Sequence, residues 1–154
     1  MIEYRRAVLA DAEELARIRS VFIAEVNDLE PDDGRVSAMK RANLAYFTSA
    51  LADGSFIAWL AVHEDEIVAT SGLSFSIVPP NFACMDGRVA YIMNMFTFPA
   101  YRGQGIATEL FARIAEEAKS LGYGKITLNA TDTGRPIYEK YGFKDMHGEM
   151  EYYV

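Results

Sequence analysis

The segment from residue 97 to residue 108 constrains this chain most, because it joins a strand-like run to an amphipathic helix through a glycine-rich turn. Residues 89–98 before it are rich in β-branched and aromatic side chains. Pro99 ends this run, since proline has no amide to give to a sheet ladder. After the turn, apolar residues recur at helical spacing from Ile106 to Leu121. The sequence therefore predicts a strand, a tight turn and a helix in succession.

The turn is a candidate phosphate-binding site. The first amides of a helix have no intrahelical partner and lie at the positive end of its dipole, so they attract anions. Gly103 and Gly105 leave room for a ligand against the backbone, and Arg102 adds forked donors that suit phosphate oxygens. A dinucleotide fingerprint would need glycine in place of Thr108, and the Gly-Lys-Ser/Thr ending of a nucleotide triphosphate loop is absent. The alternative is a purely structural turn.

Length and composition limit the remaining choices. At 154 residues with 51% hydrophobic side chains, we expect a single domain over residues 1–154 with a sizeable core. No apolar run is long enough to span a bilayer and the first residues lack a signal-like core, so we expect a cytoplasmic protein without membrane association. The net charge of -7 disfavours nucleic-acid binding. The single cysteine, Cys84, and two histidines without ligand spacing predict no metal.

The order of elements predicts an α/β (α+β) fold with a mixed, mostly antiparallel sheet flanked by helices. Asp11 is expected to cap the first helix, and the acidic stretch 25–33 to form a loop before the second. The expected strands are residues 2–7, 56–63, 67–78, 89–98, 125–130 and 149–154, and the expected helices are 12–26, 36–51, 106–121 and 136–141.

Two motifs resemble the GNAT superfamily of acyl-CoA-dependent N-acetyltransferases. The run Arg102-Gly103-Gln104-Gly105-Ile106-Ala107 is similar to the family's Arg/Gln-x-x-Gly-x-Gly/Ala signature, which binds the pyrophosphate of coenzyme A. The ending Ile137-Tyr138-Glu139-Lys140-Tyr141-Gly142-Phe143 resembles the family's tyrosine before a glycine and phenylalanine. The resemblance implies a twisted sheet whose fourth and fifth strands splay apart to admit the pantetheine arm of acetyl-CoA, the cosubstrate.

The resemblance also implies site residues. Tyr138 would protonate the departing thiolate, which its chemistry allows because a phenol stays protonated at neutral pH. A core-packing role is the alternative for Tyr138, and strand termination or helix capping is the alternative for Asn129. The residues expected to bind the cofactor are Phe96, Thr97, Phe98, Arg102, Gly103, Gln104, Gly105, Ile106, Ala107, Thr108 and Asn129.

The sequence indicates the residues that would bind and deprotonate the amine acceptor less clearly. Asn94 stands on the fourth strand where related enzymes can place a glutamate, and an amide cannot act as a general base. A water relay or a carboxylate such as Glu25 would have to serve. Asp32 and Asp33, with Glu25, make the loop acidic, which favours a cationic acceptor, although a solvated charge run explains the same residues.

These residues together predict transfer of an acetyl group from acetyl-CoA to a primary amine of a small, cationic acceptor by direct attack. A non-catalytic acyl-CoA-binding sensor and a protein or peptide N-acetyltransferase remain alternatives. The resemblance also leaves a homodimer open.

Overall fold

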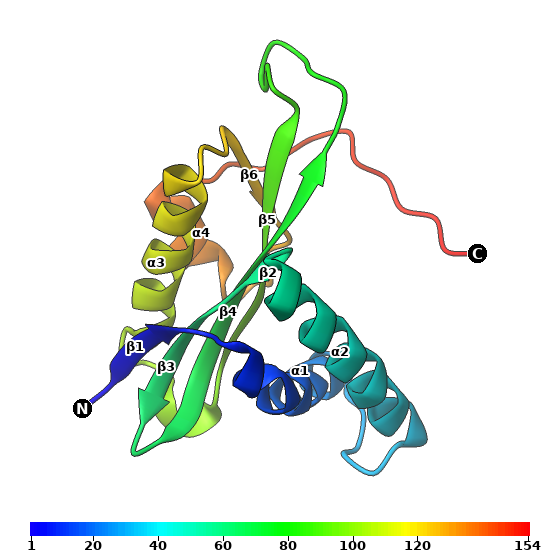
Figure 1. Ribbon diagram of the computed structural model, residues 1–154, viewed down its shortest axis with the longest axis vertical. Helices are drawn as coiled ribbons and strands as arrows, with labels where there is room; N and C mark the ends of the chain where they lie inside the picture. Colours follow the sequence, from blue (N-terminus) through cyan, green and yellow to red (C-terminus); the bar gives the residue numbers. More distant parts are fainter.

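A computed structural model describes the whole chain, residues 1–154, as one mixed sheet with helices on both faces (Figure 1). The strands are β1 (Glu3–Arg6), β2 (Phe56–Ile57), β3 (Trp59–His63), β4 (Glu66–Ile77), β5 (Arg88–Thr97) and β6 (Lys125–Leu128). The helices are α1 (Ala12–Val26), α2 (Gly34–Asp53), α3 (Ile106–Ser120) and α4 (Arg135–Tyr141), with 3₁₀ turns η1 (Leu9–Asp11) and η2 (Pro99–Tyr101). The strand order is β1-β3-β4-β5-β6, with β2 beside β4. Every pair is antiparallel except β5 with β6, so the mixed, mostly antiparallel sheet is confirmed.

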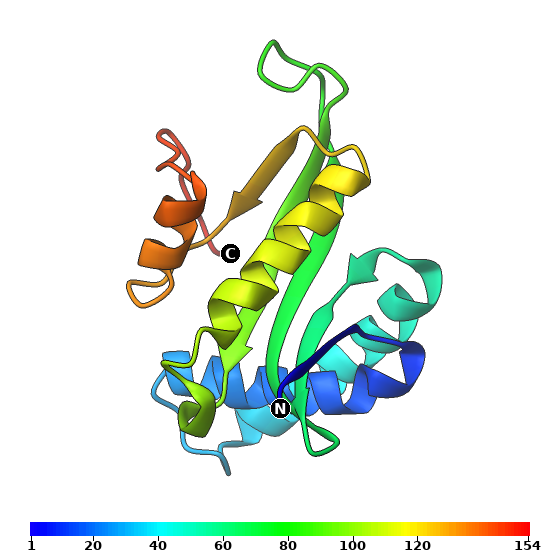
Figure 2. The ribbon, with the colours of Figure 1, turned by 90° about the vertical axis from the view of Figure 1, so that its left-hand side faces the viewer.

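The two faces of the sheet carry separate apolar cores. On one face, α1 and α2 bury Leu15, Ile18 and Phe47 against the strands. On the other face, α3 and α4 bury Phe111 and Tyr138. Figure 2 shows α3 lying along the sheet, on the face away from α1 and α2. None of the helices combines the length and apolar character needed to cross a bilayer.

An extra residue interrupts β5 at Asn94. Thr70 of β4 faces Phe96 and Gly72 faces Met93, so β5 has one more residue than β4 between these pairs. Asn94 has a backbone φ of 57°, a left-handed conformation that asparagine tolerates better than most residues. This is a β-bulge. Pairing between β5 and β6 runs only from Val89 to Ile92, just before the bulge, so the predicted splaying of these strands is confirmed.

The predicted closing strand at residues 149–154 is wrong. The chain from 142 to 154 has no helix or strand, and the side chains of Met150 and Tyr152 are exposed. A strand needs a neighbouring edge for its amides and carbonyls, and no backbone hydrogen bond joins the chain beyond Phe143 to any other segment. Gly148, with a φ of 95°, also departs from an extended backbone.

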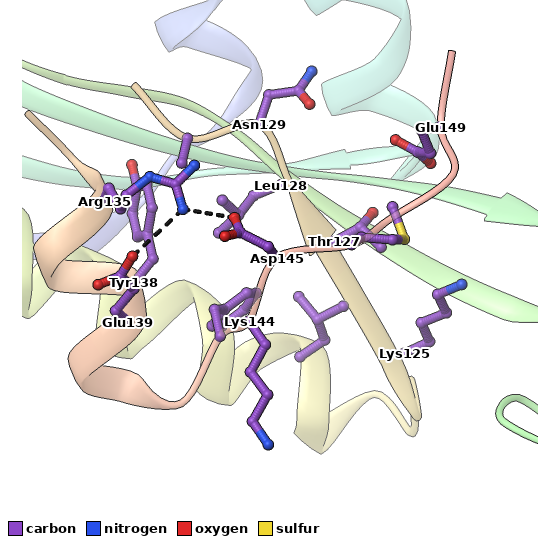
Figure 3. A pocket seen from close by; sticks show the side chains of 14 residues that line it. Lys125, Thr127, Leu128, Asn129, Arg135, Tyr138, Glu139, Lys144, Asp145 and Glu149 are labelled. Atoms are coloured by element: carbon purple, nitrogen blue, oxygen red, sulfur yellow. Dashed lines mark hydrogen bonds and ion pairs between the residues drawn. The ribbon is translucent and has the colours of Figure 1, made fainter. Parts of the chain in front are cut away.

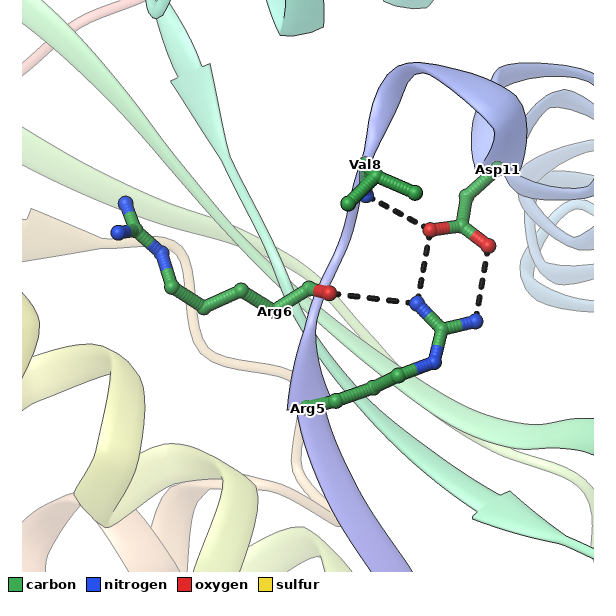
Figure 4. Close-up of polar contacts among 4 residues, drawn as sticks. All are labelled: Arg5, Arg6, Val8 and Asp11. Carbon is green, nitrogen blue, oxygen red and sulfur yellow. Dashed lines mark hydrogen bonds and ion pairs between the residues drawn. The ribbon is translucent and has the colours of Figure 1, made fainter.

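Asp11 stands at the predicted N-cap position of α1, but its side chain bonds residues that precede the helix instead of the helix amides. Its carboxylate accepts two hydrogen bonds of 2.9 Å from the Arg5 guanidinium and one of 2.7 Å from the Val8 amide (Figure 4). Arg5 also donates to the carbonyl of Arg6. Asp11 is 9% exposed, and burial would raise the pKa of its carboxyl group. The bonds from Arg5 and Val8 outweigh burial and lower that pKa below its ordinary value.

Replacing Gly72 with alanine is expected to destabilise the fold. A Cβ at this position would lie 2.4 Å from the Phe56 ring and 3.2 Å from the Met93 carbonyl, so the core would have to shift. We expect a loss of about 1–3 kcal/mol in the free energy of unfolding, measured by urea denaturation. Gly124→Ala is the control, because a Cβ on Gly124 would have nothing within 4 Å. Equal stability of the two variants would contradict the expected crowding.

Asp11→Asn is expected to cost about 1–2 kcal/mol at neutral pH, because the partly exposed Arg5 loses its charged partner. A carboxyl group with a lowered pKa stabilises the fold above its unfolded-state pKa of about 3.9, and this contribution is lost as pH falls through the folded-state pKa. The stability difference between the wild type and the variant should therefore shrink below about pH 4, in urea titrations across pH. A constant difference between pH 7 and pH 3 would contradict this role for Asp11.

Candidate active site

The turn between β5 and α3 presents a row of free backbone donors. The amides of residues 103–108 donate to no protein atom, and the first helical bond of α3 runs from the Glu109 amide to the Gly105 carbonyl. Gly103 and Gly105 have φ values of 75° and 80°, which favour glycine. Nothing lies within 4 Å of a Cβ built on either residue, so the space beside the turn is open. Free amides at a helix start beside open space fit a phosphate group.

Arg102 is held by the protein itself. Its Nε donates to the Thr97 carbonyl at 2.8 Å, and its terminal nitrogen donates to both carboxylate oxygens of Glu25 at 2.9 and 3.1 Å. The guanidinium also lies 5.6 Å from the centre of the Phe96 ring. Arg102 thus ties the turn to the last turn of α1. Phosphate binding stays a proposal for the backbone of the turn, and two of the three guanidinium nitrogens of Arg102 are already bonded to Thr97 and Glu25.

Beyond Ile92, β5 has a neighbour only on the β4 side. Its residues from Met93 to Thr97 continue along β4, whereas β6 ends at Leu128. The amide of Phe98 bonds the Val68 carbonyl at 3.0 Å, and the Thr97 carbonyl is taken by Arg102. The opened side of β5 offers main-chain groups to an extended, amide-bearing ligand, in the way that an edge accepts another strand.

Tyr138 lies on α4 with its ring against Phe111 of α3, at a centroid distance of 4.8 Å. It is 8% exposed, and its phenol has no hydrogen-bond partner in the protein. Burial raises the pKa of this phenol, so the group is protonated at neutral pH. Gly134 makes room for the ring, since a Cβ there would lie 2.8 Å from the Tyr138 oxygen. Tyr138 is therefore a mostly buried side chain whose hydroxyl is a proton donor without a protein acceptor.

A cavity of about 490 Å³ lies between β6, α4 and the C-terminal segment (Figure 3). Tyr138 lines it together with Leu128 and Asn129, which stand at the end of β6. Figure 3 shows Arg135 beside this cavity, where it pairs with Glu139 and Asp145. No residue of β5 lines the cavity. Tyr138 contacts this cavity and also packs in the core beneath β5.

The acidic residues expected around the acceptor are only partly free. Glu25 lies within α1 and is paired with Arg102. Asp33 caps α2 by accepting the Arg35 amide at 2.9 Å and also pairs with the Arg35 guanidinium. Asp32 is exposed and has no partner in the protein. No hydrogen bond or ion pair joins Asp32 or Asp33 to the turn or to Tyr138.

Asn94 is brought to the face of α1, where it meets a residue that sequence reasoning missed. Its Oδ1 accepts a hydrogen bond from Arg19 of α1 at 3.3 Å, and its main-chain carbonyl accepts from Thr70 at 2.8 Å. The partners Arg19 and Asn94 are 75 positions apart in sequence. Helical spacing placed Ile18 and Phe22 on the apolar face of α1, but nothing in the sequence marked the arginine beside them.

The fold and the free amides of the turn fit a protein that binds a phosphate-bearing ligand beside an opened sheet. The GNAT acetyltransferase domain model matches residues 32–152. The chain therefore belongs to the GNAT acetyltransferase family.

Individual relatives agree with this assignment. The glucosamine 6-phosphate N-acetyltransferase of Trypanosoma brucei brucei is 29% identical over 79 residues, covering 51% of this chain and 54% of the relative. The glucosamine 6-phosphate N-acetyltransferase 1 of Oryza sativa subsp. japonica is 28% identical over 143 residues, covering 91% of this chain and 83% of the relative. The chain thus spans about half the length of the first relative and most of the second.

Among solved structures, a predicted acetyltransferase from Clostridium acetobutylicum, crystallised with acetyl-CoA, is 36% identical to this chain. The TM-score is 0.86, with 99% of this chain and 96% of the other covered. No group of three or more histidine, cysteine, aspartate or glutamate side chains is placed to hold a metal ion.

Gly105→Ala is expected to weaken both the fold and the binding of CoA. A left-handed alanine costs about 1–2 kcal/mol, and its methyl group would enter the open space beside the free amides. At a hundred times its dissociation constant, CoA should stabilise the wild type by about 2.7 kcal/mol in thermal unfolding. The variant should keep less than about half of this stabilisation, whereas Gly124→Ala should keep all of it. Full stabilisation of Gly105→Ala would exclude the turn as the binding site.

Proposed function

We propose that the protein transfers an acetyl group from acetyl-CoA to a primary amine of a small acceptor by direct attack. The observation that carries this proposal is the row of free amides at residues 103–108, placed where β5 has lost its β6 neighbour. The related structure crystallised with acetyl-CoA supports the choice of cosubstrate. The relatives that acetylate glucosamine 6-phosphate support an amine as the acceptor.

The binding role falls to the backbone. The amides of Gly103 to Thr108 would hold the pyrophosphate, and the side of β5 without a β6 neighbour, from Met93 to Thr97, would pair with the pantetheine arm. Asn129, exposed at the end of β6, is available to the same arm. Acetyl-CoA supplies an acyl group on a thiol of pKa about 8.5, a far better leaving group than an alkoxide.

The reaction requires one proton for the departing thiolate and the removal of another from the acceptor ammonium. Tyr138 holds a proton that it can give to the departing thiolate, because its phenol is protonated at neutral pH and has no protein acceptor. A main-chain amide of β5 near Phe96 would stabilise the developing oxyanion without moving. The acceptor ammonium must also lose a proton. Because Arg102 holds both oxygens of Glu25, a water relay is the better base.

The charge of the acceptor is a separate part of this proposal. Sequence reasoning favoured a cationic acceptor from Glu25, Asp32 and Asp33. With Glu25 paired to Arg102 and Asp33 paired to Arg35, Asp32 alone remains free among the three. The acidic loop therefore argues for attraction of the ammonium group itself rather than for a polycationic molecule.

Tyr138→Phe is expected to slow acetyl transfer by about a hundredfold or more while leaving CoA binding almost intact. The ring still fills the space against Phe111, but the proton donor is gone. Transfer is measured by thiol release with a panel of primary amines, and CoA binding by thermal unfolding. Tyr141→Phe on the same helix is the control, because its hydroxyl bonds Glu116 and Lys119 at the surface.

Two outcomes would change the proposal. A wild-type rate in Tyr138→Phe would remove the acid role of this phenol. A wild-type protein that binds CoA but transfers acetyl to no amine in the panel would favour the sensor alternative.

A further inference from the structure

Arg19 is a partly buried arginine that forms no ion pair with a carboxylate. Arg88 also forms none, but its guanidinium lies over the Tyr123 ring and donates to the Leu121 carbonyl. The hydrogen bond of Arg19 to the Asn94 side chain, at 3.3 Å, is its one bond within the protein. The ionisable groups that interact with its charge are the phenols of Tyr46 and Tyr91, and no carboxylate is among them. By contrast, ion pairs with carboxylates engage Arg5, Arg6, Arg17, Arg35, Arg102, Arg113 and Arg135.

Burial makes this isolation costly. Arg19 is partly buried between α1 and the sheet, and burial lowers the pKa of its guanidinium. A guanidinium carries several N–H donors in a fork that matches carboxylate and phosphate oxygens. Most of these donors have no acceptor in the protein. A partly buried guanidinium with unpaired donors is stabilised strongly when an anion replaces the water around it.

Asn94 provides an independent sign of a missing ligand. Its side chain is 3% exposed, and its Nδ2 is the one buried side-chain nitrogen or oxygen atom in the protein without a hydrogen-bond partner. Leaving a buried donor unpaired costs about 1–3 kcal/mol. The bulge holds Asn94 in a left-handed conformation, so the amide stays at this place despite its unpaired group. Arg19 and Asn94 thus offer donors side by side and lack the same thing, an acceptor oxygen.

The position of this pair fits the acceptor side of the proposed reaction. Asn94 stands in β5 just beyond Ile92, where pairing with β6 stops. Phe96, near the amide proposed for the oxyanion, is two positions further along the strand, a distance of roughly 7 Å at strand spacing. A group bound by Arg19 and Asn94 would therefore belong to the acceptor rather than to the pyrophosphate, whose amides follow Arg102.

We propose that Arg19 and Asn94 form an anion subsite, and that the acceptor carries a carboxylate or phosphate group in addition to its amine. This inference rests on the proposed acetyl transfer and adds the chemical class of the acceptor. Arg19 holds the anionic oxygens and Asn94 Nδ2 donates to one of them, while the amine extends toward the opening along β5. The free carboxylate of Asp32 is compatible with this class, because the acceptor still arrives with a positive ammonium group.

The first experiment measures anion binding without requiring turnover. The protein is first saturated with CoA, which occupies the amides of the turn. Inorganic phosphate is then titrated into the sample, and its affinity for the protein is measured by NMR. Arg19→Gln should weaken phosphate binding about tenfold or more, because a charge-assisted bond is lost. Arg19→Lys should recover part of the affinity. Arg41→Gln, at an exposed arginine of α2 without an ion pair, should bind phosphate as the wild type does.

Asn94→Asp tests the same subsite by a different route. Aspartate tolerates the left-handed backbone, and its carboxylate would pair with Arg19 and neutralise it. Phosphate affinity should fall although Arg19 is still present. Thermal unfolding of each variant with CoA shows that the fold and the cofactor site are intact.

The class of acceptor is then determined by comparing pairs of amines that differ in one anionic group. For the phosphate arm, glucosamine 6-phosphate is compared with glucosamine, and for the carboxylate arm β-alanine is compared with β-alaninamide, each by kcat/KM for thiol release. Arg19→Gln should lower kcat/KM for the anionic member of the preferred pair about tenfold or more and leave its neutral partner within about twofold. The pair that shows this preference identifies the anion.

The outcomes separate the two proposals. Equal phosphate affinity in the wild type and Arg19→Gln would overturn the anion subsite even if acetyl transfer is observed. An equal fall in kcat/KM of Arg19→Gln for both members of each pair of amines would also overturn the anion subsite, since it would indicate a structural role for Arg19. A lack of stabilisation of the wild type by CoA would instead overturn the proposed acetyl transfer.

Discussion

The extra residue in β5 at Asn94 is the constraint on which the rest of the site depends. Up to Ile92 the strand is paired on both sides, and beyond the bulge it is paired only with β4. The main-chain groups that lose the β6 neighbour become available to a ligand. The same bulge turns the Asn94 side chain toward α1, where Arg19 meets it. One local change of backbone conformation therefore lies next to the point where β6 pairing ends and also makes the contact with Arg19.

The net charge of this protein does not predict the polarity of its site. The chain carries a net charge of -7, yet the groups left without partners at the site are donors: the amides that begin α3, Asn94 Nδ2 and most of the Arg19 guanidinium. Much of the acidity is already compensated, because Glu25 and Asp33 pair with arginines. Free donors at buried or pre-oriented positions determine ligand preference more strongly than solvated charges at the surface, where water screens them.

Several features of the site could be predicted from the sequence because they depend on neighbours in the chain. The glycines of the turn require positive φ values, and helical spacing from Ile106 onward requires α3 to begin there. Tyr138 lies on the short predicted helix. Other features depend on distant neighbours and were missed or mistaken. The contact between Arg19 and Asn94 joins residues far apart in sequence. Asp11 is the N-cap residue of α1, but its side chain bonds Arg5 and Val8. The expected last strand finds no edge to pair with.

By itself the sequence determined the order of the elements as far as α4, the glycine-rich turn before α3 and the family to which the chain belongs, because each of these depends on residues that are adjacent or regularly spaced. Only the tertiary structure decided which charges are free. Arg102 and Glu25, 77 positions apart, neutralise each other, while Arg19 is left with an amide as its partner. The physical reason is that an ion pair forms through space, and helix packing on a sheet, which no local pattern encodes, determines which side chains meet.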